Sequence, residues 1–405
     1  MIESSALFIA AKPIIQKIID HGYEAYFVGG AVRDSLLNKP VSDVDIATSA
    51  TPLEIKAIFT KTFDVGIEHG TVLVYEQGVG YEITTFRTES NYEDFRHPSS
   101  VSFVRSLEED LKRRDFTINA LALSIDDRVI DYFGGQEDLA RQLLRSVGLA
   151  QERFSEDALR MFRAIRFVSQ LDFAVDPETI EAIRLLKANL SHVAVERIQV
   201  EWVKTLVGPA RNRAIKLLVD TGLYEYCPKL ADQKENLLSF SENTFPQLST
   251  FQAWVLLCHY LGFHSENVRP FLKAWKLSNK VLDETQAGLG LLHERFTRKW
   301  NFFMAFSHPL HVSLEVEALL PSLGYQDESQ FLENVYKELP IESLKQLAFN
   351  GKDIQELLNL KKSGPIIGQS LTYLKNAVLN QEVKNTKEDL QDYLLSADFI
   401  KNLYH

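Results

Sequence analysis

The segment YEAYFVGGAVRD, residues 23–34, decides how the first part of this chain folds. It places a short strand-like run directly before Gly29 and Gly30, and a helical pattern follows from Ala31. Bare backbone at a glycine can approach a triphosphate closely and donate N–H groups to it. A tight turn without a ligand would explain one glycine more readily than two. The segment therefore predicts a strand, a phosphate-binding turn and a helix that opens with Arg33.

Mixed periodicities extend on both sides of this segment, through residue 140. Helical spacing occurs at residues 6–20, 53–59 and 113–125, and strand-like runs occupy residues 41–47, 71–75, 81–86 and 101–103, with a turn at Gly78–Gly80. From Glu137 onward almost every segment is helical, and prolines recur at helix starts and breaks. The pattern predicts an α+β fold, in which a head with a small mixed β-sheet precedes an elongated all-α part.

Composition narrows the class of protein. The chain has 405 residues, of which 45% are hydrophobic and 24% charged, as expected for a globular protein of two to four domains. No apolar run approaches the ~18 residues of a membrane helix. Two cysteines are too few for a disulfide framework or a thiolate metal site. We therefore expect a cytoplasmic protein that does not bind membranes.

Charge gives two possible interpretations. The net charge of −11 argues against indiscriminate DNA binding, and we expect no DNA partner. A local basic track nevertheless exists, formed by the six arginines Arg141, Arg145, Arg153, Arg160, Arg163 and Arg166. This track could bind nucleic acid, or it could be a solvated helix surface whose charges are paired in salt bridges.

Three acidic residues are candidates for catalysis. Asp43 and Asp45 lie two apart in an alternating segment, so in a strand both carboxylates would project from one face. Adjacent carboxylates repel unless a cation lies between them, and oxygen ligands of this kind suit Mg²⁺. Glu82 would be a third acid if the strand over residues 81–86 pairs beside the first, with Tyr81 and Ile83 turned to the core.

Five motifs in order resemble those of the class II tRNA nucleotidyltransferases. They span about the first 170 residues and read GGAVRD (29–34), DVD (43–45), RRDFTINA (113–120), DYFGG (131–135) and EDALR (156–160). The resemblance implies an enzyme that adds C, C and A to the 3′ end of tRNA without a nucleic-acid template, using CTP, ATP and Mg²⁺. It also implies a head over residues 1–140, a neck over 141–207, a body over 208–318 and a tRNA-binding tail over 319–405.

The resemblance also implies roles for individual residues. Asp43 and Asp45 would bind two Mg²⁺ ions, with Glu82 as a third carboxylate. The RRDFTINA motif would bind ribose and triphosphate, and we expect Asp115 and Asn119 to share one face of a helix. The residues expected to bind the nucleotide are Gly29, Gly30, Arg33, Arg114, Asp115, Asn119, Asp157, Arg160, Arg163 and Arg166.

Asp157 and Arg160 are the expected base selector. Three residues apart, they would share one helix face and offer an acceptor beside a donor. Cytosine and adenine present the matching donor and acceptor, whereas uracil and guanine present the reverse, and each buried polar group left unpaired costs roughly 1–3 kcal/mol. The alternative is an intrahelical salt bridge worth ~0.2–0.5 kcal/mol. We expect Glu156 to support Arg160 rather than read a base.

A polar, poorly patterned stretch over Thr88–Ser100 predicts a long loop, of a length usually functional or disordered. By resemblance, a flexible loop with Tyr92, Asp94 and Arg96 supports the switch from C to A addition. An inert mobile loop is the alternative.

Three other functions stay open. A poly(A) polymerase would share the head, although the segment GIEHGT (66–71) favours the CCA-adding branch. An enzyme that adds only A or only CC is the second, and a non-catalytic RNA-binding protein is the third. The intact pairs Asp43/Asp45 and Asp157/Arg160 disfavour the last. The sequence leaves open whether the protein is a monomer or a homodimer.

Overall fold

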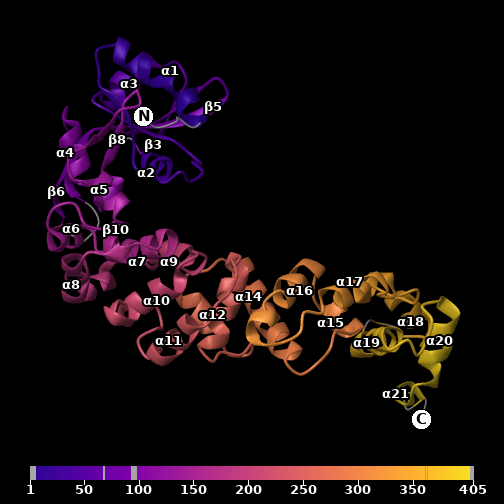
Figure 1. Cartoon of the computed structure of the whole chain (residues 1–405). Coiled ribbons are helices and arrows are strands. Elements are labelled where there is room, and N and C mark those ends of the chain that lie inside the picture. Colours follow the sequence, from indigo (N-terminus) through magenta and orange to yellow (C-terminus); the bar gives the residue numbers. More distant parts are fainter. Residues whose placement is uncertain (1–5, 67–68, 93–97, 361, 363, 402–405) are drawn as a thin grey trace. The chain divides into compact units, whose positions relative to one another are not determined.

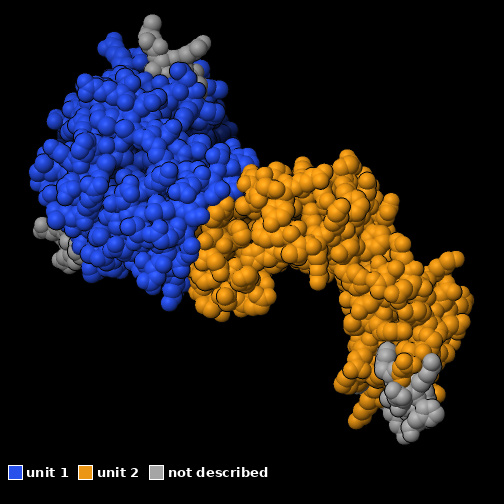
Figure 2. All heavy atoms as spheres, turned by 60° about the horizontal axis from the view of Figure 1, so that its bottom comes forward, with its two compact units in different colours: residues 1–247, 274–276 blue, residues 248–273, 277–405 orange. Residues whose placement is uncertain are grey.

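The structure is a computed structural model that describes residues 6–66, 69–92, 98–360, 362 and 364–401. The chain forms two compact units, coloured separately in Figure 2. Unit 1 comprises residues 1–247 and 274–276, and unit 2 comprises residues 248–273 and 277–405. A sheet at the start of the chain and helices after it confirm the expected α+β class (Figure 1).

A seven-stranded mixed sheet forms the first part of unit 1. Across the sheet the strands are β3 (Thr62–Gly66), β4 (Thr71–Glu76), β5 (Val79–Thr85), β2 (Asp45–Thr48), β1 (Ala25–Val28), β8 (Leu121–Leu123) and β9 (Val129–Asp131). β2 and β5 are parallel, and the other neighbouring strands are antiparallel. The turn between β4 and β5 lies at Gln77–Gly78, one position earlier than expected, and both residues have positive φ.

The expected strand–turn–helix unit is present around Gly29. β1 ends at Val28, Gly29 adopts φ +74° and ψ −138°, and α2 (Gly30–Leu36) begins at the next residue. Further along, α3 (Pro52–Ile58) begins with a proline and a capping box between Thr51 and Glu54.

Each face of the sheet has its own core. On one face, Phe27 of β1 meets Phe8 of α1 (Ala6–Asp20) edge to face, with ring centroids 4.9 Å apart. On the other face, Val28, Ala47 and Ala122 belong to a buried cluster with residues of α4 (Leu107–Lys112). Directly paired residues point to the same face, so Asp45, paired with Val28, shares this second face.

The loop expected over Thr88–Ser100 was wrong where the structure describes it. The backbone forms an antiparallel hairpin of β6 (Arg87–Tyr92) and β7 (Pro98–Phe103), in which Thr88 pairs with Ser102. Serine and threonine read as loop formers in the sequence, but cross-strand pairing satisfies their backbone. Tyr92 ends β6, whereas Asp94 and Arg96 lie outside the described residues.

The helix expected over residues 113–125 was also wrong. Arg113 follows α4, Phe116 makes an isolated bridge to Ser146, and a single 3₁₀ turn, η2 (Thr117–Asn119), leads into β8. β8 is buried at every position, and a short continuous apolar run does not distinguish a buried strand from a helix.

The rest of unit 1 is helical apart from a short parallel pair, β10 (Leu143–Leu144) with β11 (Ala174–Val175). A core of Phe162, Trp202 and Trp275 joins these helices, the two indoles stacking with centroids 5.7 Å apart. The elements are α5 (Gly135–Ala140), α6 (Ala150–Glu156), α7 (Leu159–Leu171), α8 (Pro177–Leu186), η3 (Lys187–His192), α9 (Val195–Leu206), α10 (Arg211–Asp220), η4 (Leu223–Tyr226) and α11 (Lys234–Glu242).

The remaining helices run from α12 to α21. They are α12 (Thr250–Tyr260), α13 (Arg269–Ala274), α14 (Asn279–Arg295), α15 (Phe302–Ser307), α16 (Leu310–Glu317), η5 (Leu320–Leu323), α17 (Ser329–Lys337), η6 (Leu344–Gln346), α18 (Gly351–Leu357), α19 (Pro365–Leu379), α20 (Lys387–Ser396) and α21 (Asp398–Lys401). Glu317 is fully buried and accepts from Arg295 and Trp300. Within the described part of the chain, no helix has both the length and the apolar character to cross a membrane.

Candidate active site

An arginine-rich cavity of about 490 Å³ lies in unit 1. Residues of the sheet, η2, α7 and α9 contribute to it, although they are far apart in sequence. Its lining consists of Gly29, Gly30, Arg33, Asp45, Arg113, Arg114, Asp115, Asn119, Asp157, Leu159, Arg160, Arg163, Arg166, Phe167 and Arg197. The cavity thus contains every residue expected to bind the nucleotide.

The glycine turn lies against the first arginine of this cavity. A Cβ added at Gly29 would lie 3.1 Å from Nη1 of Arg114 and 3.8 Å from Oδ2 of Asp45. The guanidinium of Arg114 is therefore beside both the turn and the carboxylate. Its buried Nε has no hydrogen-bond partner among the described residues. A cation with an unmatched donor, next to a glycine turn that begins a helix, suits an anionic ligand.

Asp43 and Asp45 do not both lie in a strand, contrary to the expectation. β2 begins at Asp45, because β1 ends at its partner Val28 and β5 joins only from Ile46. Asp43 therefore lies in the irregular segment before β2, where Ser42 donates to its Oδ1 at 3.0 Å.

Asp43 and Glu82 nevertheless both act on Asp45. Loss of hydration raises the pKa of Asp45; the negative charge of Asp43 raises it further, Arg114 lowers it, and Glu82 raises it. Ile46 pairs with Ile83 across parallel strands, so the preceding residues, Asp45 and Glu82, share the opposite face. Glu82 is exposed while Tyr81 and Ile83 are buried, which confirms the orientation expected for β5.

These acids fit a divalent cation that shares its ligands with a substrate. No three His, Cys, Asp or Glu side chains form a complete metal-binding group in the described ranges. Mg²⁺, however, is usually held by one or two carboxylates together with phosphates and water. Loss of hydration is the main cause of the raised pKa of Asp45, and the repulsion from Asp43 and Glu82 that adds to it is the interaction that a cation would relieve.

A second network holds Asp115 and Asn119, although they do not share a helix. Asn119 donates to Oδ1 of Asp115 at 3.1 Å and accepts from Nη1 of Arg33 at 2.6 Å. Arg163 donates from Nε to Oδ2 of Asp115 at 2.7 Å. Burial would raise the pKa of Asp115, but the charge of Arg163 and these hydrogen bonds lower it to about 2. Asp115 is therefore a fixed, ionised acceptor.

The common helix face expected for Asp157 and Arg160 was wrong. Asp157 ends α6 in an extended conformation and its Oδ1 accepts from the backbone of Leu159, so a break separates it from α7. Asp157 pairs with Arg197 at 2.7 Å, and Arg160 pairs with Glu156 at 2.6 Å, as expected for a supporting role of Glu156. Both members of the pair still line the cavity.

Arg197 of α9 lines this wall and Glu201 of the same helix supports it; neither was singled out from the sequence as a site residue. Arg197 holds Asp157, and Glu201, which is buried, lies 2.6 Å from Nε of Arg166. Burial lowers the pKa of Arg166 to about 10. The available signal was the four-residue spacing of Arg197 and Glu201, which places both charges on one face of the helix.

The basic track turns out to be paired. Each of its six arginines forms an ion pair with a carboxylate: Arg141 with Glu137, Arg145 with Asp138, Arg153 and Arg160 with Glu156, Arg163 with Asp115, and Arg166 with Glu201. Arg160, Arg163 and Arg166 also line the cavity. Those three are therefore both salt-bridged and exposed to a ligand.

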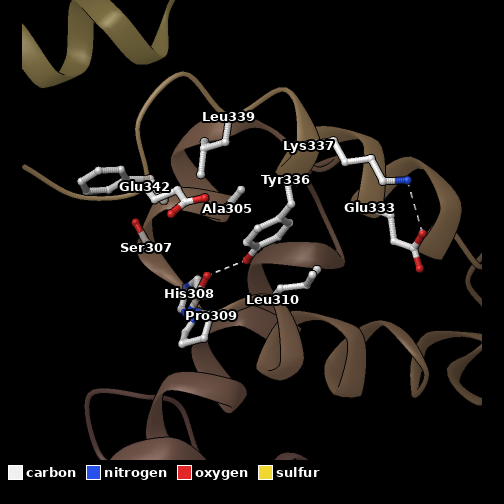
Figure 3. Close-up of a pocket in the computed structure, with 11 residues that line it drawn as sticks. Ala305, Ser307, His308, Pro309, Leu310, Glu333, Tyr336, Lys337, Leu339 and Glu342 are labelled. Atoms are coloured by element: carbon white, nitrogen blue, oxygen red, sulfur yellow. Dashed lines mark hydrogen bonds and ion pairs between the residues drawn. The ribbon is translucent and has the colours of Figure 1, made fainter. Parts of the chain in front are cut away.

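A different cavity, of about 700 Å³, lies among α15, α16 and α17 of unit 2 (Figure 3). Phe306, Pro309, Leu310 and Leu339 contribute apolar surface. The hydroxyl of Tyr336 donates to the backbone oxygen of His308 at 2.5 Å. Its lining contains neither an arginine nor an aspartate, so it offers no counterpart of the acid–arginine chemistry in unit 1.

Known proteins match almost the whole chain. Residues 25–145 match the poly A polymerase head domain, residues 172–234 the probable RNA and SrmB-binding site of polymerase A, and residues 247–394 the putative tRNA nucleotidyltransferase domain 2. The CCA-adding enzyme of Geobacillus stearothermophilus is 47% identical over 96% of both chains. This chain belongs to the CCA-adding enzyme family. The CCA-adding enzyme of Enterococcus faecalis is 45% identical to it over 95% of both chains.

Solved structures of CCA-adding enzymes have the same fold as this chain. The Bacillus stearothermophilus CCA-adding enzyme in complex with CTP is 45% identical, with a TM-score of 0.92 over 99% of this chain and 100% of that one. The Thermotoga maritima CCA-adding enzyme complexed with tRNA shares the fold. It is 22% identical, with a TM-score of 0.59 over 96% of this chain and 94% of that one. The resemblance inferred from the five motifs is confirmed.

Proposed function

We propose that this protein adds C, C and A to the 3′ end of tRNA, using CTP and ATP and releasing pyrophosphate. The observation that carries the proposal is a single cavity that joins Gly29, Asp45 and Arg114 to Asp157 and Arg160. The first three residues offer phosphate and metal chemistry, and the last two offer a hydrogen-bonding edge for a base. Family membership makes these the expected parts of one reaction site.

The nucleotide would lie with its triphosphate at the glycine turn. Backbone N–H groups of Gly29 and Gly30 and the guanidinium of Arg114 would bind phosphate oxygens. Asp115, kept ionised by Arg163, would accept a hydrogen bond from a ribose hydroxyl. Charged partners already fix these side chains, so little side-chain entropy is lost when the nucleotide binds.

Asp43 and Asp45 would hold Mg²⁺, with Glu82 as a third acid on the same side. When bound, the metal ions would lower the pKa of the primer's 3′-hydroxyl and offset charge on the leaving pyrophosphate. The chain itself contributes the carboxylates and keeps those of Asp45 and Glu82 on one face of the sheet.

Asp157 and Arg160 would select the base. Arg197 and Glu156 orient them, and the carboxylate and guanidinium have more hydrogen-bonding capacity than these contacts use. An acceptor next to a donor matches cytosine and adenine, whereas uracil and guanine leave both groups mispaired. The salt bridges seen here are thus compatible with base reading.

The segment that contains hairpin β6–β7 would support the change from C to A addition. This proposal rests on the resemblance for Tyr92, Asp94 and Arg96, and on the root of the hairpin at Arg87, whose backbone N–H donates to Asp110 in the cavity's supporting network.

The division into head (1–140), neck (141–207), body (208–318) and tail (319–405) is proposed on the same basis. Residues of the cavity would come from head and neck, and the tail would bind tRNA. We place the protein in the cytoplasm, where its proposed substrates occur.

An addition assay separates this function from its alternatives. Trimmed tRNA, Mg²⁺ and single nucleotides should give two C additions with CTP, and one A only after CC. A poly(A) polymerase would give a long A tract, an A-only or CC-only enzyme would stop short, and an RNA-binding protein would give no product. Asp45→Ala should abolish addition and leave tRNA binding nearly unchanged. Asp64→Ala, which removes an exposed carboxylate paired with Lys56, should keep full activity.

A further inference from the structure

Asp110 is a buried acid that the proposed reaction does not use directly. It lies in α4, its side chain is 1% exposed, and it does not line the cavity. Burial would raise the pKa of Asp110, but Arg113 and Arg114 and the hydrogen bonds to the carboxylate lower it. Asp110 is therefore a buried negative charge held by cationic partners.

One oxygen of Asp110 faces Arg114. The Nη2–Oδ2 distance is 3.4 Å, and among the described residues Asp110 is the carboxylate with which Arg114 forms an ion pair. Nη1 of the same guanidinium lies near the backbone oxygen of Asn119, at 3.4 Å, and beside Gly29. Asp110 thus restrains the cation that the proposed triphosphate would meet.

The other oxygen of Asp110 binds Arg113. Nε and Nη2 of Arg113 donate to Oδ1 at 3.0 and 2.7 Å. The backbone oxygen of Arg113 in turn accepts from Nη2 of Arg160 at 2.9 Å. A second chain of contacts therefore runs from Asp110 to the residue proposed to read the base.

The same Oδ1 also accepts from the backbone N–H of Arg87, at 3.3 Å. Arg87 is the first residue of β6 and pairs with Phe103, so this bond is made at the root of the hairpin. Asp110 consequently contacts three parts of the structure. These are Arg87 at the root of the hairpin, Arg114 at the proposed phosphate site, and Arg113, which in turn binds Arg160.

We propose that Asp110 is a positioning residue for nucleotide binding, acting through Arg114 and Arg113 and fixed in turn to the root of β6. The inference rests on the proposed function, because it assumes that Arg114 meets the triphosphate. It adds a residue outside the cavity on which affinity for CTP and ATP depends.

A double-mutant cycle tests the proposal. The affinity of the full-length protein for CTP is measured by calorimetry without tRNA, for the wild type, Asp110→Asn, Arg114→Lys and the double variant. Asp110→Asn keeps the shape and removes the charge, and it should weaken CTP binding about tenfold, the effect of losing one charge-assisted hydrogen bond. The two losses should not multiply in the double variant, because part of the effect of Asp110 passes through Arg114.

Steady-state kinetics give a second reading. In C addition, Asp110→Asn should raise KM for CTP by a similar factor and leave the affinity for tRNA unchanged. Glu317→Gln is the matched control, because it also removes a buried carboxylate paired with an arginine, outside the cavity. The control should melt at a lower temperature with an unchanged KM for CTP.

Unchanged CTP affinity in folded Asp110→Asn, or losses that multiply in the double variant, would overturn the inference. A KM that rises equally in Glu317→Gln would also overturn it, because loss of stability would then explain the effect. If the wild type adds CCA while any of these results is found, the role of Asp110 is refuted and the proposed function is retained. If the wild type adds no nucleotide, the proposed function itself fails.

Discussion

Replacing Gly29 by alanine tests the glycine turn in isolation. Gly29 has φ +74° and ψ −138°, a conformation that costs a residue with a Cβ about 1–3 kcal/mol. The new Cβ would also lie 3.1 Å from Nη1 of Arg114, so the guanidinium must shift by a few tenths of an ångström. A displacement of about 1 Å at such a site can cost about a hundredfold in rate. We therefore expect kcat/KM for C addition to fall about tenfold.

The assay compares Gly29→Ala with Gly78→Ala, using trimmed tRNA and CTP, and records melting curves for both. Gly78 has φ +86° and nothing within 4 Å of an added Cβ, so its replacement adds backbone strain without touching the cavity. Both variants should melt a few degrees below the wild type, at about 2–4 °C per kcal/mol for a unit of this size. Equal kcat/KM values for the two variants would refute the reasoning, because strain alone would then account for any loss.

Three other predictions concern the acids, the base selector and the hairpin. The pKa of Asp45 is raised in the folded protein, so the folded wild type loses stability as the pH rises through that pKa. Without divalent cations, Asp45→Asn should therefore melt at a higher temperature than the wild type at pH 7. The difference should vanish below about pH 4, where an unfolded aspartate is also protonated. A lower melting temperature at pH 7 would contradict this. Asp157→Ala with Arg160→Ala should lose the preference for C and A over U and G in single-nucleotide incorporation, and retained selectivity would argue against base reading by the protein. Deleting residues 89–99 should spare CC addition and impair the final A, whereas a normal yield of CCA would remove the hairpin from the mechanism.

The sequence predicts a feature well where one local signal decides it. Two adjacent glycines after an apolar run allowed few conformations, and the strand, turn and helix at residues 25–36 are present. The alternation in residues 81–83 likewise predicted which side chains of β5 are buried. In both places the backbone preference and the burial pattern agree, so tertiary contacts had nothing to override.

The sequence predicts a feature poorly where residues far away in the chain determine the local structure. Residues 121–123 read as part of a helix, but they form a strand because β1 and β9 flank them. Asp157 and Arg160 read as neighbours on one helix, but the hydrogen bond from Leu159 to Asp157 and the pairing with Arg197 break the helix between them.

The arginines show the same limit. Charge along the chain could not tell a nucleic-acid track from a salt-bridged surface, because the acids that pair with Arg163 and Arg166 lie far away in sequence. The resemblance of the five motifs predicted which residues line the cavity. The network that holds them, including Asp110, Arg197 and Glu201, required the fold.

The central claim is that Asp43 and Asp45 hold divalent cations against a triphosphate bound at Gly29 and Arg114. A crystal structure of the protein with CTP and Mn²⁺, with anomalous scattering recorded at the manganese edge, measures this directly. We expect manganese coordinated by carboxylate oxygens of Asp43 and Asp45 and by phosphate oxygens. Manganese bound only elsewhere, or a triphosphate outside the arginine-lined cavity, would contradict the account.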